Sequence, residues 1–576
     1  MTEIFKFYES FIKIFSSNQK KQFFILISFS IIAMILETIS LASIFPILDL
    51  FFNDSSKIKE YLIFERIYEI TNKDLIVVYL SAIFLLVFLI KAIFLTFFLH
   101  QKNVFVYSIR NLQTNNLLKS YVYNDYLFHL DNNSASLIRN INDANLLSVF
   151  ARSLIDFTSE IILFTGILIF LLIIYPTLTL SISLFFFVIA IIFFKIFQSK
   201  ISFYGEKSRY YRGIKLKNLK EIFGGIREIK IFGQENNFLK IFNKNNFFEN
   251  DLTRRHTFIA GLPKIWFEWL TILILSILLI FLVKKVDDSN SIIPLLGLYL
   301  FSAFKIVPAV IKITNLLQDM KFSLPSIRPY TSNKHQIEGE ILENQKNIEE
   351  KNTNFGFKKK IDINNLKYEY PSNKKKIFDN LNISINKNQL IGIYGESGSG
   401  KTTLINLLLG LLQPNDGEIL VDGKDILNDI NGWQRKISYI PQSIFIIDEK
   451  IFNNVALGVP VNEININKVK ECLKFANLSE FIDELPEGIN TNCGELGDKI
   501  SGGQKQRLAI ARAFYNNAEV LIFDEFTNNL DKENETKIME DIFKLKDKTR
   551  IIVSHSSKVL SYCEKIFEIK KINNIK

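Results

Sequence analysis

Six long apolar stretches dominate the first half of this sequence. Each is long enough to cross about 30 Å of hydrocarbon as a helix, at about 1.5 Å per residue. A buried globular core would not supply six such runs, so the sequence predicts six membrane-spanning helices. The predicted spans are residues 23–52, 75–99, 146–175, 177–197, 258–283 and 291–317.

Basic residues near the ends of these spans predict how the chain is oriented. The segments 1–21, 102–145 and 195–264 together contain 23 Lys and Arg, whereas the segments on the other side of the membrane contain 6. Because basic loops stay on the cytoplasmic side, the first group is predicted to be cytoplasmic, with both chain ends inside. The net charge of +10 then reflects contact with the lipid bilayer, and we expect no nucleic-acid partner.

The segments beside the spans predict further elements. Residues 1–21 carry apolar residues at helical spacing opposite charged ones, which predicts an amphipathic helix on the inner membrane surface. Residues 53–74 predict a short external helix, and the long cytoplasmic loops predict that spans two to five continue as helices below the membrane. The polar residues 331–355 are typical of a linker. We therefore divide the chain into a transmembrane domain (1–330), this linker, and a second domain (356–576).

Charged residues inside the predicted spans are candidates for a substrate site, because charge in the membrane is costly and commonly retained for function. Lys91, Arg152, Lys305 and Lys312 all lie toward the inner leaflet. One interpretation is a basic ring around an inward-facing cavity that suits an anionic headgroup. The alternative is that these long side chains reach the inner interface and that Arg152 forms a structural pair with Asp156.

A phosphate-binding loop is the clearest motif of the second half. Residues 391–402 read IGIYGESGSGKT, a short apolar strand followed by a glycine-rich turn and then an apolar helix. Glycines let backbone N–H groups approach phosphates, and the helix N-terminus adds a partial positive charge. We expect Lys401 to reach the β- and γ-phosphates and the Thr402 hydroxyl to bind Mg²⁺. The predicted ATP-binding residues of this loop are Gly395, Glu396, Ser397, Gly398, Ser399, Gly400, Lys401, Thr402 and Thr403.

A later strand ends in two acids. Residues 519–525 read EVLIFDE. Asp524 is predicted to hold Mg²⁺ through water, and Glu525 to polarise the attacking water as a general base. Together with the P-loop, these acids predict ATP hydrolysis with Mg²⁺ as cofactor.

Between these motifs, residues 501–507 read SGGQKQR and precede the helical run LAIARAF. This matches the signature of ATP-binding cassettes, and residues 356–576 resemble the cassette half of an ABC transporter. The resemblance implies that Tyr370 stacks on adenine and that Gln442 contacts Mg²⁺ and senses the transmembrane half. It implies that His555 contacts the γ-phosphate, so the predicted catalytic residues are Glu525, His555 and Gln442. The remaining predicted ATP-binding residues are Ser501, Gly502, Gly503, Gln504 and Asp531, and the resemblance implies that Ser501 and Gly502 face Lys401 of a second chain.

The order of the two halves resembles the ABC exporter (type IV) class. That class combines a membrane all-α domain of six transmembrane helices with a following α/β P-loop ATPase domain, the ABC cassette. One cassette and six spans imply a half-transporter that works as a homodimer, in which ATP binding closes the cassettes and hydrolysis reopens them. Short coupling helices are expected near residues 123–129 and 223–229.

Three segments resemble the bacterial lipid-linked oligosaccharide flippases (PglK-like): LETISLASIFPILDLFF, GGIREIKIFGQENNFLKIF and YIPQSIFIIDEKIFNNVALG. This implies an amphipathic or lipid-linked substrate, a polyprenyl-pyrophosphate-linked oligosaccharide, flipped across the bacterial cytoplasmic (inner) membrane with the cassette in the cytoplasm. A lipid-A, multidrug or peptide exporter shares the remaining features and stays open as an alternative. The spans argue against a soluble ABC ATPase, and an ATP-gated channel would differ by conducting ions continuously while ATP is bound.

Overall fold

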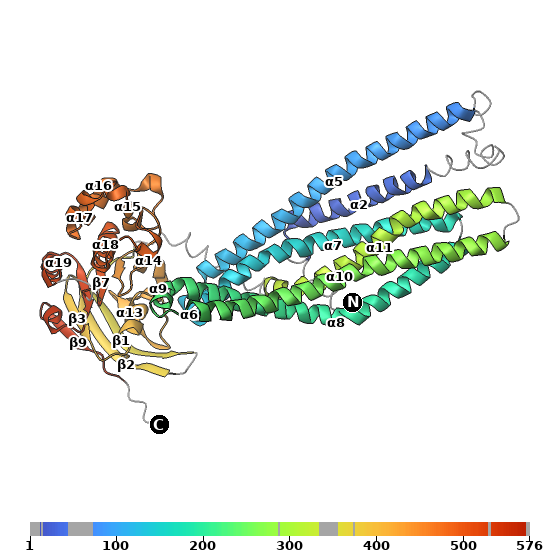
Figure 1. Ribbon diagram of the computed structural model, residues 1–576. Coiled ribbons are helices and arrows are strands. Elements are labelled where there is room, and N and C mark those ends of the chain that lie inside the picture. The colour runs from blue at the N-terminus through green and yellow to red at the C-terminus, as the bar shows by residue number, and fades with distance from the viewer. Residues whose placement is uncertain are drawn as a thin grey trace. The chain divides into compact units, whose positions relative to one another are not determined.

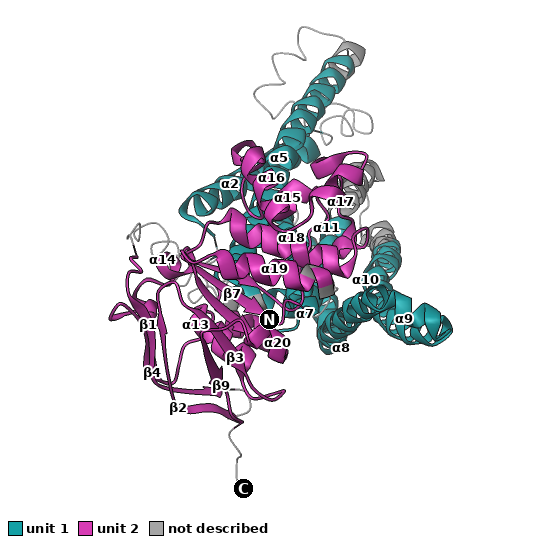
Figure 2. Cartoon of the chain, turned by 90° about the vertical axis from the view of Figure 1, so that its left-hand side faces the viewer, with its two compact units in different colours: residues 1–123, 132–341 teal, residues 124–131, 342–576 magenta. Residues whose placement is uncertain are grey.

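The chain forms two compact units, which Figure 2 shows in different colours. Unit 1 contains residues 1–123 and 132–341, and unit 2 contains residues 124–131 and 342–576. The change from unit 1 to unit 2 after residue 341 falls within the segment predicted as a linker. The computed structural model describes residues 12, 15–43, 73–174, 176–285, 289–332, 355–371, 375–527 and 532–571.

Unit 1 consists of long helices formed by the apolar stretches and the polar segments that continue them (Figure 1). Helices are expected here because a backbone in hydrocarbon must satisfy its own N–H and C=O groups. The described helices are α2 (Ser17–Ala42), α5 (Lys73–Tyr123), α7 (Ser134–Ile174), α8 (Pro176–Gly224), α10 (Glu235–Lys285) and α11 (Ser289–Ser332). Each of the six predicted spans begins on one of these six helices, in order; residues 44–52 of the first span and residue 175 of the third lie outside the described part of the chain.

Five of these helices, α2, α5, α7, α8 and α10, are long and apolar enough to cross a membrane. The side chains of residues 289–305 in α11 lie outside the described part of the chain. Helices α5 and α10 each have 51 residues and α8 has 49, more than twice the ~20 that hydrocarbon requires. Spans two to five therefore continue as long helices, and that the continuations lie below the membrane stays a prediction.

An apolar core joins α2, α5, α7 and α11. Buried residues recur along α7 every three or four positions, from Leu147 through Phe150 to Ile155, which makes a continuous apolar stripe. They pack with Ile109 of α5 and Ile327 of α11. Helix α7 lies along α11, and α8 lies along α10 (Figure 1).

The turn between α7 and α8 is as short as the sequence predicts. Helix α7 ends at Ile174 and α8 begins at Pro176, a position where proline is favoured because its missing N–H would have no partner. The Thr179 hydroxyl donates to the backbone carbonyl of Leu171 across this turn at 3.2 Å. The two helices therefore form a tight hairpin.

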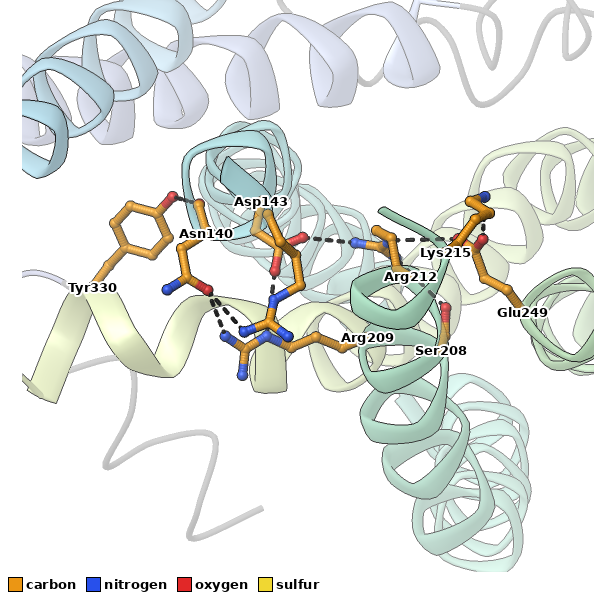
Figure 3. Close-up of polar contacts among 9 residues, drawn as sticks. Asn140, Asp143, Ser208, Arg209, Arg212, Lys215, Glu249 and Tyr330 are labelled. Carbon is orange, nitrogen blue, oxygen red and sulfur yellow. Dashed lines mark hydrogen bonds and ion pairs between the residues drawn. The ribbon is translucent and has the colours of Figure 1, made fainter. Parts of the chain in front are cut away.

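A charged network ties the polar parts of α7, α8 and α10 together (Figure 3). The Asp143 side chain of α7 is 1% exposed. Its carboxylate accepts hydrogen bonds from Arg209 Nε at 3.3 Å and from Arg212 Nη1 at 2.8 Å, both on α8. Arg212 Nε also donates to Glu249 of α10 at 3.4 Å. One buried acid thus holds two arginines, one of which reaches a third helix.

Asn140, one turn before Asp143, extends this network to two more helices; Figure 3 shows its contact with Tyr330. Its side-chain oxygen accepts from Arg209 Nη2 at 3.3 Å, and its side-chain amide donates to Tyr121 of α5 at 3.0 Å. Its backbone carbonyl accepts from the hydroxyl of Tyr330 in α11. These contacts join five helices of unit 1 in one polar cluster.

Unit 2 contains a four-stranded antiparallel sheet and a five-stranded parallel sheet (Figure 1). The antiparallel sheet has the order β2-β1-β4-β5, and the parallel sheet has the order β6-β7-β8-β3-β9. Every residue of β7 and β8 is buried, as is typical of parallel strands covered on both faces. The strands are β1 (Lys360–Tyr370), β2 (Lys375–Asn386), β3 (Leu390–Tyr394), β4 (Asp416–Val421), β5 (Lys424–Asp425), β6 (Ile437–Ile440), β7 (Val520–Asp524), β8 (Thr549–Val553) and β9 (Lys565–Glu568).

The parallel sheet separates two apolar cores. Val520 and Ile522 of β7 belong to the core shared with α13 (Lys401–Leu408) and the antiparallel sheet. Leu521 and Phe523 belong to the core shared with α16, α18 and α19, because successive side chains of a strand point to opposite faces. The remaining helical segments of unit 2 are η2 (Ile426–Asp429), α14 (Ile430–Gln434), α15 (Ile451–Val455), η3 (Val461–Glu463), α16 (Ile466–Phe475), α17 (Ser479–Glu484), η4 (Gly488–Asn490), η5 (Glu495–Gly497), α18 (Gly502–Tyr515), α19 (Lys532–Lys544) and α20 (Ser557–Leu560).

Two short helices lie where the sequence predicts coupling helices. They are α6 (Tyr126–Asp131) and α9 (Ile226–Ile231). Helix α6 belongs to unit 2, where half-buried Leu127 packs against the core that contains α13. The helices are confirmed, and their coupling role stays a prediction.

Several predicted elements fall largely on residues outside the described part of the chain. They are the inner-surface helix (1–21), the external helix (53–74) and the linker (331–355). Asp531 also lies outside it. These expectations stand as they were derived from the sequence.

Candidate ATP-binding site

Four parallel strands bring the predicted site residues to one edge of the sheet. Strands β6, β7, β8 and β3 are neighbours in that order and run parallel. Their carboxyl ends lead into Gln442, Asp524 with Glu525, His555 and the P-loop, respectively. Ligands of open α/β sheets bind outside this edge. The topology therefore gathers motifs that are far apart in the sequence.

The P-loop backbone requires glycine at two positions. A Cβ atom at Gly395 would lie 2.4 Å from the backbone oxygen of Ile569, and one at Gly400 would lie 2.5 Å from the Ile377 side chain. Gly400 also has φ +107°, which L-residues rarely adopt. The Ser399 hydroxyl is buried and makes no hydrogen bond within the described residues. The loop thus offers bare backbone and an unpaired hydroxyl to a ligand.

Lys401 begins α13 and is buried at 8% exposure. Its ammonium group donates to the backbone oxygens of Gly395 at 2.8 Å and Glu396 at 3.1 Å. His555 Nε2 lies 3.0 Å from the same nitrogen and 3.2 Å from Glu525 Oε1. The predicted phosphate-binding lysine, γ-phosphate histidine and general base therefore form one connected cluster.

Both oxygens of Glu525 contact predicted site residues. His555 is at Oε1, and Gln442 Nε2 donates to Oε2 at 2.7 Å. Glu525 has φ +45°, a left-handed conformation that is uncommon outside glycine and is typical of functional sites. Glu525 thus contacts both of the other predicted catalytic residues, and its carboxylate is held from both sides.

Asp524 is held by a residue that the sequence analysis does not single out. The Tyr439 hydroxyl donates to Asp524 Oδ2 at 3.1 Å. Burial raises the pKa of Asp524 above its usual range, and Glu525 adds to this, while the hydrogen bond from Tyr439 opposes it. Burial next to Asp524 also raises the pKa of Tyr439, so the phenol remains a hydrogen-bond donor. An aromatic residue three positions before Gln442 was the available signal in the sequence.

The remaining P-loop residues lie around this cluster. Tyr370, the predicted adenine-stacking residue, ends β1, and its hydroxyl lies 3.3 Å from the Thr403 hydroxyl. Thr402, Glu396 and Ser397 are exposed. The residue predicted to stack on the base is therefore beside the helix that begins with the phosphate-binding lysine.

The signature residues form the start of α18 and contact their own helix. Ser501 caps the helix by accepting from the backbone N–H of Gln504 at 3.2 Å, and Gln504 accepts from the backbone N–H of Ser501 at 2.8 Å. Gly502 and Gly503 are the first two residues of the helix. Within the described residues, the side-chain hydrogen bonds of Ser501 stay inside this cap, and Ser501 is exposed.

The side chains at this edge fit a magnesium ion. Mg²⁺ prefers oxygen ligands and binds through few protein groups while keeping water. The Thr402 hydroxyl, the Asp524 carboxylate and the Gln442 amide are such groups. We assign Thr402, Gln442 and Asp524 as the residues that would hold Mg²⁺.

Three of the four predicted substrate-site residues have described side chains, and the structure pairs two of them with acids. Lys91 of α5 forms a buried ion pair with Glu37 of α2 at 2.7 Å. Lys312 of α11 pairs with Glu160 of α7. The side chain of Lys305 lies outside the described part of the chain. Neither Lys91 nor Lys312 is therefore an isolated cation.

The predicted structural pair between Arg152 and Asp156 was wrong. Asp156 pairs with Lys102 of α5 at 2.6 Å, whereas Arg152 donates to Asn103 at 3.3 Å. The i, i+4 spacing brought the two residues to one side of α7, but α5 supplies a closer cation. Interhelical packing decided the pairing.

Family comparisons agree with this architecture. Residues 11–305 match the family described as the ABC transporter transmembrane region, and residues 378–528 match the family described as ABC transporter. A solved bacterial Atm1-family ABC exporter with ATP bound has a similar fold, with a TM-score of 0.71 at 18% identity over 96% of this chain and 94% of that one.

Two relatives are similar over part of their length. The alpha-hemolysin translocation ATP-binding protein HlyB of Escherichia coli is 39% identical over 213 residues, which are 37% of this chain and 30% of HlyB. A putative multidrug export ATP-binding/permease protein of Staphylococcus aureus is 39% identical over 213 residues, which are 37% of this chain and 36% of that protein. The match spans about a third of each relative. Because the transmembrane family alone covers more than half of the sequence, the chain belongs to the ABC transporters, with a helical transmembrane region followed by an α/β nucleotide-binding cassette.

Proposed function

We propose that this chain is an ATP-driven half-transporter that works as a homodimer in a bacterial cytoplasmic membrane. Its proposed substrate is amphipathic or lipid-linked, a polyprenyl-pyrophosphate-linked oligosaccharide moved from the inner to the outer leaflet. The observation that carries the proposal is the contact cluster of Lys401, His555, Glu525 and Gln442 in a chain that also has spanning helices.

The cluster supports ATP hydrolysis by the chain's own side chains. Lys401 places positive charge where the β- and γ-phosphates would lie. Glu525 accepts the proton of the attacking water. Gln442 and His555 contact the two carboxylate oxygens of Glu525 at 2.7 and 3.2 Å. Mg²⁺, when bound with ATP, supplies neutralisation of the phosphate charge.

The position of the signature supports a homodimer. Ser501 is exposed, and its described hydrogen bonds are used within its own cap. The cap of a 14-residue helix is suited to an anion because backbone N–H groups and the helix dipole point outward there. A second copy would supply the nucleotide that this cap faces.

The charges along α7 support an anionic headgroup as substrate. Arg152 is exposed, and the Lys312 side chain is 51% exposed although it pairs with Glu160. Together with Lys102, this stripe contains three cations and two acids, Asp156 and Glu160. The excess positive charge and its exposure fit a pyrophosphate better than a neutral substrate.

Transport in proteoliposomes tests the proposal. ATP-dependent movement of a polyprenyl-pyrophosphate-linked glycan is expected for the intact chain and not for Glu525→Gln. The pair Lys305→Ala with Lys312→Ala should weaken substrate-stimulated ATPase, whereas Lys264→Ala, an exposed lysine of α10, should not. An unaltered response in the double variant would leave these lysines no role in the substrate site.

The alternative is a multidrug, lipid-A or peptide exporter. The names of the two relatives, which describe alpha-hemolysin translocation and multidrug export, favour it. Good ATP-dependent transport of such a substrate without movement of the lipid-linked glycan would decide for this alternative, with the ATP site unchanged.

A further inference from the structure

Asp524 receives its hydrogen bond from a neighbouring strand. The Tyr439 hydroxyl donates to Oδ2 at 3.1 Å, and the Asp524 side chain is buried at 7% exposure. In the described part of the chain, Tyr439 is the side chain hydrogen-bonded to this acid. A buried carboxylate with one fixed oxygen has few orientations left for the other oxygen.

Strand register explains why Tyr439 reaches Asp524. Tyr439 of β6 is opposite Ile522 of β7, and Asp524 is two residues farther along the same face. At about 3.3 Å per residue this is about 6.6 Å, which an extended phenol side chain covers. Because both residues are fixed by a parallel ladder, the contact is built into the sheet.

Helix α6 packs against the apolar cluster that contains the Tyr439 ring. Leu127 of α6 and Tyr439 both line the core on the α13 side of the sheet. The ring that holds Asp524 is therefore in the same packed cluster as a segment whose chain neighbours on both sides belong to unit 1.

We propose that Tyr439 is a positioning residue for the metal-binding acid Asp524, and that α6 acts on this acid through the packing of Tyr439. The hydroxyl orients Oδ2, so that Oδ1 is the oxygen that would serve Mg²⁺ when ATP is bound. A shift of α6 would displace the ring and loosen the acid. The inference rests on the proposed function only in requiring that the cassette binds ATP with Mg²⁺.

Tyr439→Phe tests the first part, because it keeps the ring and removes one hydroxyl. The probe is Mn²⁺ binding to the full-length protein in nanodiscs with a non-hydrolysable ATP analogue, followed by electron paramagnetic resonance. We expect Mn²⁺ affinity to fall about 10-fold, as is usual when a partner of a metal ligand is removed. Nucleotide affinity in EDTA and the melting temperature should stay unchanged.

Tyr515→Phe is the matched control. Tyr515 ends α18, and its hydroxyl accepts a hydrogen bond from the backbone N–H of Asn465 at 3.1 Å, so the substitution removes a phenol hydroxyl away from Asp524. It should leave Mn²⁺ affinity unchanged. Equal Mn²⁺ affinity for Tyr439→Phe and the unmodified protein would overturn the positioning role. A parallel loss of nucleotide binding in EDTA would also overturn it, because a general structural defect would then account for the result.

Two leucines of α6 test the second part. Leu127→Ala should weaken Mn²⁺ binding in the same direction as Tyr439→Phe, whereas Leu130→Ala, at a side chain 48% exposed, should not. Equal results for both leucines would remove α6 from the proposal. If the unmodified protein bound neither the analogue nor Mn²⁺, the proposed ATPase function itself would fail. Normal Mn²⁺ binding in Tyr439→Phe would instead overturn only the positioning role of Tyr439.

Discussion

Replacing Asp143 by Asn should destabilise unit 1 strongly, because this buried acid holds two arginines (Figure 3). Removing one partner of a buried ion pair costs about 3–5 kcal/mol. Arg209 and Arg212 are 23% and 25% exposed, so water partly solvates the charges that remain, and Asn still offers one acceptor. We therefore expect a loss of about 2–3 kcal/mol.

The measurement is the melting temperature in matched nanodiscs. At about 2 °C per kcal/mol for a unit of this size, Asp143→Asn should melt about 4–6 °C below the unmodified protein. Asp251→Asn is the control, because Asp251 also pairs with two arginines, Arg254 and Arg255, but these pairs lie within α10 and both arginines are more than half exposed. Such exposed pairs contribute little, so this control should melt with the unmodified protein. An equal shift for both variants, or none for Asp143→Asn, would refute the claim that burial makes this network strong.

Three further outcomes follow from the same contacts. Glu525→Gln should lower ATP turnover at least ~10²-fold and trap bound ATP; unchanged phosphate release would remove Glu525 as the base. Lys91→Met should lower the melting temperature by leaving Glu37 without its lysine, and adding Glu37→Gln should restore much of it; no restoration would contradict the ion-pair explanation. Burial alone would raise the pKa of Glu519, but hydrogen bonds from Lys436 and Lys387 outweigh it and lower the pKa below its usual 4.5. Its stabilising effect is therefore present at neutral pH and lost as the pH falls through that lowered value, so the melting temperatures of the unmodified protein and Glu519→Gln should differ at pH 7 and converge in acid.

Much of the ATP site could be predicted from the sequence because its motifs depend on local backbone geometry. Gly400 at φ +107° and the apolar strand before the P-loop can be recognised from neighbouring residues alone. The strand order at one sheet edge then places Lys401, His555 and Glu525 together. Tyr439 was missed because the register of β6 against β7 is set by tertiary pairing.

In the membrane half, too, the sequence predicts the elements but not the contacts between them. The lengths of the apolar stretches were enough to predict the helices, because crossing hydrocarbon requires a fixed number of apolar residues. They did not predict that Asp156 pairs with Lys102 or that Glu37 pairs with Lys91. Those pairs depend on how each helix is rotated against its neighbour.

The primary structure thus determines which segments become helices and strands, because apolar length, glycine freedom and proline position act within a few residues. Side-chain partners at Asp143, Asp524 and Glu37 are decided by packing between elements that are distant in the chain. These contacts require the helix rotation and strand register that close packing imposes, because a buried charge is stable only where a partner lies within reach of it.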